Sequence, residues 1–429
     1  MDWLFAWGLS RWRECRGLLH RLWWLRDQVR RILIGATSAT IAFVWFTLPP
    51  EGLSAYLAEP NNLGIVFESI AVSTLVLGAV NFWARQRVDF VLERLPPLGP
   101  SDIRLRDGER VIPFRDQALL HMPAADRLLD AARNPLVYQP RPVPVHPLVQ
   151  ELLPLFIARL PDAQLDTTDD AKLRLGSDLT PSLLQRGDPV HLQATSYFRD
   201  RLTNSLANYR VRLQGRQLLD LRHEVLEPDG ELMLLKTSPL ANQLGASTLL
   251  VTADAQVVYL RQGNRVAENR QRLAPSGSGS FDRPAPARLG TMSFQDLARQ
   301  EARRELREEC GLQASDIVAL RLCAFGRYLY RNGKPEVFCL ARTQRYASDI
   351  QVPVREWDFQ QRQVERHAFD GPVDAPQLAQ ALDVLRLKLE RGAAGFENVS
   401  GPLYWAVVLA RDDLLQMDEA SRRAFFGAV

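Results

Sequence analysis

The stretch from Gly290 to Leu312 constrains the fold of this chain more than any other segment. It reads GTMSFQDLARQEARRELREECGL and places Glu305, Glu308 and Glu309 at the spacing i, i+3, i+4. An α-helix has 3.6 residues per turn, so these three carboxylates share one helical face. A hard divalent cation such as Mg²⁺ relieves the repulsion between them by taking oxygen ligands. We therefore expect a metal-binding face here; the alternative is an ordinary charged surface helix.

The same stretch resembles the Nudix box, which reads Gly, five residues, Glu, seven residues, Arg-Glu-hydrophobic-x-Glu-Glu-x-Gly-hydrophobic. The corresponding residues in this chain are in register, namely Gly290, Asp296, Arg304, Glu305, Leu306, Glu308, Glu309, Gly311 and Leu312. One position departs from the family pattern, because Asp296 stands where the pattern has Glu. The motif is long and specific, so a chance match is the weaker explanation.

This resemblance implies a loop-helix-loop in which Glu308 and Glu309 bind Mg²⁺. Glu305 would be a further metal ligand or the general base, so Glu305 and Arg304 are the candidate catalytic residues. Asp296 would pair with Arg304 and hold the helix in place. The shorter Asp side chain puts that pairing in question but leaves the metal-binding face intact.

The segments around the box have the apolar runs and turn residues typical of strands. They are residues 247–260, 273–281, 319–330, 336–341 and 403–409. Asn332-Gly333 predicts a hairpin turn between the third and fourth of these. The glycine-serine stretch at 273–281 is similar to the family's strand before the box, without its paired glycines. Over 241–429 the resemblance implies a Nudix-like α/β/α sandwich with a mixed sheet.

Two apolar runs near the N-terminus predict a transmembrane hairpin. Residues 32–48 form an uncharged run of 17, and residues 63–83 form a run of 21 whose one charged residue is Glu68. At about 1.5 Å per residue, both approach the thickness of a bilayer core of about 30 Å. A buried core hairpin is the alternative for the shorter run. The predicted fold class is therefore a membrane-anchored α/β protein.

Charge around these runs predicts their orientation. Residues 1–31 hold seven Arg against three acidic residues, whereas the loop at 49–62 has two Glu and no Lys or Arg. By the positive-inside rule, both termini are cytoplasmic and the protein lies in the inner membrane. Residues 1–31 also carry five Trp and are typical of an amphipathic helix at the lipid surface; alternatively, these Trp pack on the rest of the protein.

Within the predicted spans, several residues favour association between helices. The small-xxx-small pairs are Gly35 with Ala39 and Ser69 with Ser73. Glu68 either faces a cavity or partner or reaches the outer interface. These residues are consistent with a homo-oligomer that forms on activation.

Between the hairpin and the box, the chain is predicted to have two parts. Residues 84–164 are proline-rich and predict a stiff juxtamembrane linker, and residues 165–240 lead into the Nudix-like domain. Within the lead-in, residues 195–210 are similar to the segment that precedes the core in Nudix hydrolases of sugar nucleotides. By that similarity Tyr197, Thr203 and Asn204 are candidate nucleotide-binding residues; a capped amphipathic helix is the alternative.

Composition narrows the partners. The net charge of +3 comes mostly from arginines near the predicted membrane segments, which favours anionic lipid over duplex nucleic acid. Four Cys without paired spacing fit a reducing compartment.

Domain order adds a second resemblance, to the transmembrane-Nudix effectors of bacterial CBASS antiphage systems. It implies a sensor of a cyclic oligonucleotide or other nucleotide made by a partner CD-NTase, with hairpins that assemble and disrupt the inner membrane. The alternative is a tethered Mg²⁺-dependent hydrolase of a nucleoside diphosphate derivative. A nearly intact box leaves hydrolysis open, and the sensor function is the favoured hypothesis.

Overall fold

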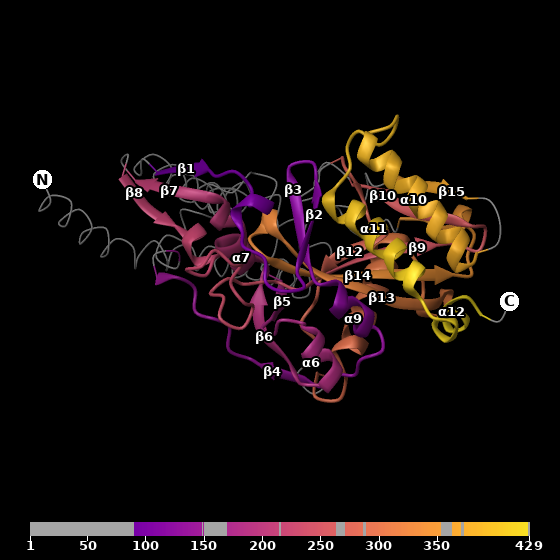
Figure 1. The fold of residues 1–429 in the computed structure, drawn as a ribbon, viewed down its shortest axis with the longest axis horizontal. Helices are drawn as coiled ribbons and strands as arrows, with labels where there is room; N and C mark the ends of the chain where they lie inside the picture. Colours follow the sequence, from indigo (N-terminus) through magenta and orange to yellow (C-terminus); the bar gives the residue numbers. More distant parts are fainter. Residues whose placement is uncertain are drawn as a thin grey trace, which may run out of the picture. The chain divides into compact units, whose positions relative to one another are not determined.

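The computed structural model describes residues 90–147, 149, 170–213, 216–262, 271–285, 289–352, 363–369 and 373–427. The chain divides into two compact units, and the larger one comprises Leu92–Val145, Asp162–Val211 and Gln217–Val429. This larger unit contains the main sheet, its covering helices and the box (Figure 1).

The main sheet has nine strands in the described part of the chain. Its order is β11-β10-β9-β14-β13-β3-β2, with β12 paired to β9 and β15 paired to β10. The β9–β14 pair is parallel and the others are antiparallel, so the sheet is mixed. The strands are β2 (Arg110–Phe114), β3 (Gln117–His121), β9 (Gly245–Val251), β10 (Gln256–Arg261), β11 (Leu273–Ala274), β12 (Gly277–Ser280), β13 (Ile317–Tyr328), β14 (Lys334–Thr343) and β15 (Gln363–Ala368).

Helices cover both faces of this sheet. Every residue of β9 is buried, as expected for a strand covered on two sides. Leu249 packs in one core cluster with α10 (Ala375–Arg391) and α11 (Gly401–Gln416). Its neighbour Leu250 packs with α9 (Phe294–Cys310) in another cluster, because successive side chains of a strand point to opposite faces.

Smaller elements complete the described structure. A second sheet has the order β4-β6-β5, and a third has the order β1-β7-β8. The strands and helices are β1 (Phe90–Arg94), β4 (Leu136–Gln139), β5 (Ala171–Leu175), β6 (Val190–Ser196), β7 (Tyr209–Leu213), β8 (Arg216–Asp220), α4 (Pro123–Leu129), α6 (Pro181–Arg186), α7 (Tyr197–Asp200) and α12 (Glu419–Phe426).

The stretch expected to be a linker contributes to the main sheet. Strands β2 and β3 both lie within residues 84–164, and β3 pairs with β13. Leu119 and Leu120 of β3 are buried, whereas a solvated spacer would expose them. A proline-rich composition does not exclude strands at a sheet edge. Pro113 lies in β2, the edge strand, where a missing amide donor is tolerated.

The membrane-anchored fold class and the inner-membrane localisation require correction. None of the helices in the described residues is long and apolar enough to cross a membrane. Among the described helices, α9 and α10 have 17 residues each and several charges, whereas a span takes about 20 mostly apolar residues. The predicted spans at 32–48 and 63–83, with Gly35, Ala39, Glu68, Ser69 and Ser73, lie outside the described residues.

Among the elements predicted around the box, the hairpin is confirmed and one strand is wrong. The hairpin is confirmed as β13 and β14, with Asn332 and Gly333 at positive φ in the turn. The strand predicted at 403–409 is wrong, because these residues belong to helix α11. Ser400 caps α11, and residues 401–410 are buried, so no polar stripe marked its helical period.

Candidate active site

The box forms the predicted loop-helix-loop. Helix α9 begins after Ser293, whose hydroxyl accepts a hydrogen bond from the Asp296 amide at 3.1 Å. The Asp296 carboxylate accepts a hydrogen bond from the Ser293 hydroxyl at 2.7 Å, and this hydrogen bond lowers the pKa of Asp296. The helix ends at Gly311, which has the left-handed φ of 71°. These caps fix both ends of the helix that carries the acidic residues.

The predicted pairing of Asp296 with Arg304 is wrong. Eight residues separate them, a rise of about 12 Å along the helix, which is too far for an ion pair. The Arg304 guanidinium instead contacts Glu301 at 2.9 Å and Glu308 at 2.6 Å, and it also contacts Glu305. Glu301, which the motif does not specify, therefore pairs with Arg304 in place of Asp296. Its position one helical turn before Glu305 could have indicated from the sequence that it lies on the same face.

A buried acidic row runs along α9 at intervals of four residues. Glu301, Glu305 and Glu309 are 3%, 6% and 3% exposed. Strand β12 pairs with β9, and its other edge meets this row. Glu309 accepts a hydrogen bond from the Ser278 amide at 2.9 Å, and Glu301 accepts from the Asp282 amide at 3.0 Å. Glu301 and Glu309 therefore satisfy backbone donors that would otherwise lack partners.

Two glycines of β12 allow α9 to approach this closely. A Cβ atom at Gly279 would lie 2.1 Å from a carboxylate oxygen of Glu305, and one at Gly277 would lie 3.0 Å from the Leu306 amide nitrogen. Alternate residues of a strand share a face, so the two glycines form one shallow surface under the helix. The glycine-serine stretch was predicted only as a strand; the i, i+2 spacing of its two glycines is what indicates this close approach of a helix.

Burial and crowding perturb the acids of this site. Burial raises the pKa of Glu305 to about 8; Glu309 and Glu308 add to the rise, while Arg304 opposes it. Burial also raises the pKa of Glu301. Burial disfavours the charge of Arg304, but the surrounding carboxylates, Glu305 first, hold its pKa above the ordinary value. Burial and the neighbouring carboxylates thus favour the protonated form of Glu305 more than Arg304 favours its ionised form.

The donor chemistry of the site suits a divalent cation. Glu305, Glu308 and Glu309 present carboxylate oxygens, the ligands Mg²⁺ prefers. Within the part of the chain that is described, no cluster of three or more such side chains is already arranged to hold a metal ion. Arg304 lies among these carboxylates and supplies the positive charge there. Burial is the largest cause of the raised pKa of Glu305, and Glu309 and Glu308 add to it. A cation bound between these carboxyl groups would lower that pKa, so the residues fit a divalent cation.

The candidate nucleotide-binding residues lie apart from the acidic row in sequence and have protein partners. Thr203 accepts from the Ala241 amide at 2.9 Å, and its hydroxyl donates to the Arg199 carbonyl at 2.7 Å. Buried Asn204 accepts from the Asn242 amide at 2.9 Å. The hydroxyl of Tyr197 accepts from Arg201. These contacts hold the segment after β6 to the chain preceding β9.

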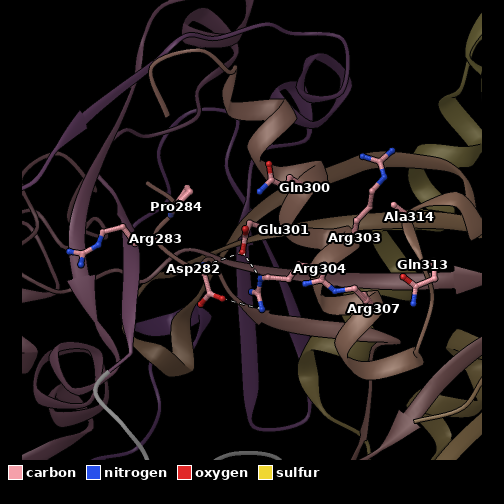
Figure 2. A pocket seen from close by; sticks show the side chains of 10 residues that line it. All are labelled: Asp282, Arg283, Pro284, Gln300, Glu301, Arg303, Arg304, Arg307, Gln313 and Ala314. Atoms are coloured by element: carbon pink, nitrogen blue, oxygen red, sulfur yellow. Dashed lines mark hydrogen bonds and ion pairs between the residues drawn. The ribbon is translucent and has the colours of Figure 1, made fainter. Parts of the chain in front are cut away.

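A cavity of about 720 Å³ lies beside the acidic row. Gln300, Arg303, Arg304 and Arg307, at the spacing i, i+3, i+4, i+7, supply one helical stripe of its wall. Figure 2 shows Arg304 turned toward Asp282 and Glu301, whereas Arg303 extends away from that group. The cavity and the acidic row thus use adjacent faces of the same helix and share Glu301 and Arg304.

Comparisons with known proteins give only distant similarities. No family model and no curated protein matches the chain. Among solved structures, DR0079 from Deinococcus radiodurans has 18% identity over 43% of this chain and 95% of its own, with a TM-score of 0.25. A MutT protein from Methanosarcina mazei has 12% identity over 41% of this chain and 91% of its own, with a TM-score of 0.21. At these scores the likenesses carry no argument about activity, which must rest on the residues of α9.

Proposed function

We propose that the chain is a Mg²⁺-dependent, Nudix-like hydrolase whose substrate is a nucleoside diphosphate derivative. The observation that carries this proposal is the buried acidic row of α9, in which Glu305 has a pKa raised to about 8. Burying several carboxylates is costly for folding, and such clusters occur where chemistry requires them. Glu308 and Glu309 would hold the cation, and Glu305, on the same helical face, would be the general base.

Each residue has a task in this proposal. When bound, Mg²⁺ would supply charge neutralisation for the diphosphate and increase the acidity of a coordinated water. Glu305 would accept a proton from the attacking water, because a base with a pKa near neutrality both takes and releases protons readily. Arg304 orients Glu305 through their direct contact, and Glu301 in turn holds Arg304 at 2.9 Å.

Replacing Glu308 and Glu309 by Gln tests this function. Gln keeps an acceptor for the Ser278 amide but removes the charge, so the fold should survive. We expect the full chain to release phosphate-containing product from nucleoside diphosphate derivatives only with Mg²⁺, and the double variant to lose at least about 100-fold in kcat/KM. The control is Glu419→Gln, an exposed residue of α12. Equal turnover in the double variant and the control would refute the assignment.

A second candidate is a nucleotide sensor that binds without cleavage, as expected from the resemblance to CBASS effectors. The contacts of Arg304 favour it, because this guanidinium already engages Glu301, Glu305 and Glu308 and would have to yield to a catalytic cation. A sensor would bind a cyclic oligonucleotide with no product formed, would assemble into homo-oligomers with it, and would act with a CD-NTase as partner. Calorimetry with cyclic oligonucleotides, paired with product analysis, separates the two candidates.

A further inference from the structure

The cavity beside the acidic row has an excess of positive charge. Its arginines are Arg283, Arg303, Arg304 and Arg307, and its carboxylates are Asp282 and Glu301. Both carboxylates are already engaged by Arg304, at 3.4 Å and 2.9 Å. The guanidinium groups of Arg283, Arg303 and Arg307 therefore line the cavity without pairing with Asp282 or Glu301.

Arg303 is the clearest case of an uncompensated cation. It has no ion-pair partner among the residues that the structure describes, and its side chain is half-buried in the cavity wall. Within the described residues, Arg307 has one ion-pair contact, 3.6 Å to Glu308, which is long for an ion pair, and its side chain is 56% exposed. A partly buried guanidinium without an anion is unfavourable, so this wall favours an anionic ligand.

The spacing and chemistry of the wall narrow the ligand to a phosphate. Arg303 and Arg307 lie one helical turn apart and both line the cavity, so one wall presents two guanidinium groups, which are favoured donors to phosphate oxygens. The other described lining residues are amides, with Pro284 and Ala314 as the small apolar ones, and none is aromatic. The described wall therefore offers a nucleobase no aromatic face for stacking, whereas a charged group finds several donors.

We infer that this cavity binds a further phosphate group of the ligand, so that the site prefers molecules with more phosphates than a diphosphate. The inference rests on the proposed function in one respect, because it assumes that the diphosphate lies on the acidic row through a cation. The cavity shares Arg304 and Glu301 with that row, so a chain of linked phosphates would pass from one face of α9 to the next.

Calorimetry on the full chain with Mg²⁺ tests the inference, with inorganic pyrophosphate and inorganic tripolyphosphate as probes. We expect wild type to bind tripolyphosphate at least tenfold more tightly than pyrophosphate. The variant Arg303→Gln/Arg307→Gln should lose this preference, because each charged hydrogen bond contributes about a tenfold change in affinity. The matched control, Arg186→Gln/Arg423→Gln, removes two exposed arginines of α6 and α12 and should retain the preference.

Equal affinity of wild type for the two probes, or a preference that persists in the Arg303/Arg307 variant, would overturn the inference. The single variant Arg307→Gln, at an exposed position, should bind tripolyphosphate several-fold more weakly and covers the case in which the double variant does not fold. Failure of the proposed function has a different signature: Glu308→Gln/Glu309→Gln would leave Mg²⁺-dependent pyrophosphate binding unchanged, whatever the arginine variants do.

Discussion

Helices α9 and α11 cover opposite faces of the same sheet, yet their buried surfaces differ in kind. Trp405 of α11 is fully buried and packs in a cluster with Leu249 of β9. On the other face, α9 buries Leu306 against Leu250, but it also buries three glutamates. Residues 401–410 of α11 include no charged side chain. The two helices thus contribute apolar burial alike, but α9 adds a row of three buried carboxyl groups, whereas α11 adds one largely buried carboxyl group, Asp413, which pairs with Arg321 at 2.6 Å.

This difference indicates which helix serves stability and which serves chemistry. Apolar burial stabilises the fold at about 25 cal/mol per Å², whereas burying a carboxylate costs free energy unless partners compensate it. This cost is expressed at Glu305, whose pKa is raised by burial although the carboxyl group contacts Arg304. Natural proteins retain such costs at functional sites, so α9 is where we expect activity to be most sensitive.

The largest stability effect should come from α11. Replacing Trp405 by Ala removes its apolar packing and the hydrogen bond that its indole donates to the Ile112 carbonyl at 3.0 Å. We expect the free energy of unfolding to fall by about 3–5 kcal/mol in chemical denaturation. The control Leu415→Ala, at a position 61% exposed on the same helix, should change it by less than about 0.5 kcal/mol. If the Trp405→Ala protein folds but loses turnover, the assignment of stability to α11 and of chemistry to α9 would be wrong.

A substitution in β12 should affect both stability and activity. At Gly279, an added Cβ would meet the Glu305 carboxylate at 2.1 Å and displace it from Arg304. We expect Gly279→Ala to reduce the free energy of unfolding by about 1–3 kcal/mol and to reduce kcat/KM at least tenfold. The control is Gly99→Ala, where the new Cβ would have an ordinary contact at 3.5 Å. Similar behaviour of the two variants would argue against close packing of α9 on β12.

The smallest effect, taken per pH unit, is the pH dependence that Glu305 of α9 should contribute to stability. The pKa of Glu305 is about 8 in the folded state and about 4.5 when unfolded, so the folded state binds more protons between these values. Stability should therefore fall as pH rises through this window, by at most about 1.4 kcal/mol per pH unit for this one group. Thermal unfolding of metal-free wild type and Glu305→Gln measures it.

In that experiment, Glu305→Gln should have the shallower slope, and added Mg²⁺ should flatten the slope of wild type. The other raised carboxyl pKa in the row, that of Glu301, remains in both proteins and cancels from the comparison. Asp296 and Asp316 have lowered pKa values and act below this window. Parallel slopes would mean that Glu305 titrates alike in the folded and unfolded states. Burial on α9 would then impose no pH-dependent cost at this residue.

Sequence reasoning succeeded where the determining contacts are local. The i, i+3, i+4 spacing predicted the helix and its acidic face, and Asn332-Gly333 predicted the β13–β14 hairpin. It failed at residues 403–409, because an apolar run without a polar stripe looks the same for a buried strand and a buried helix. It also assigned Asp296 to Arg304 by family pattern, although Ser293 offers a partner three residues away.

That Glu305, Glu308 and Glu309 share one face of a capped helix follows from their spacing, since helical periodicity depends only on positions along the chain. What that face contacts depends on segments distant in the sequence. The glycines of β12 bring its backbone against Glu305 and Glu309, and Asp282 joins Arg304 from outside the helix. Burial raises the pKa of Glu305, and burial depends on how β12 and α9 pack, which no spacing along one helix specifies.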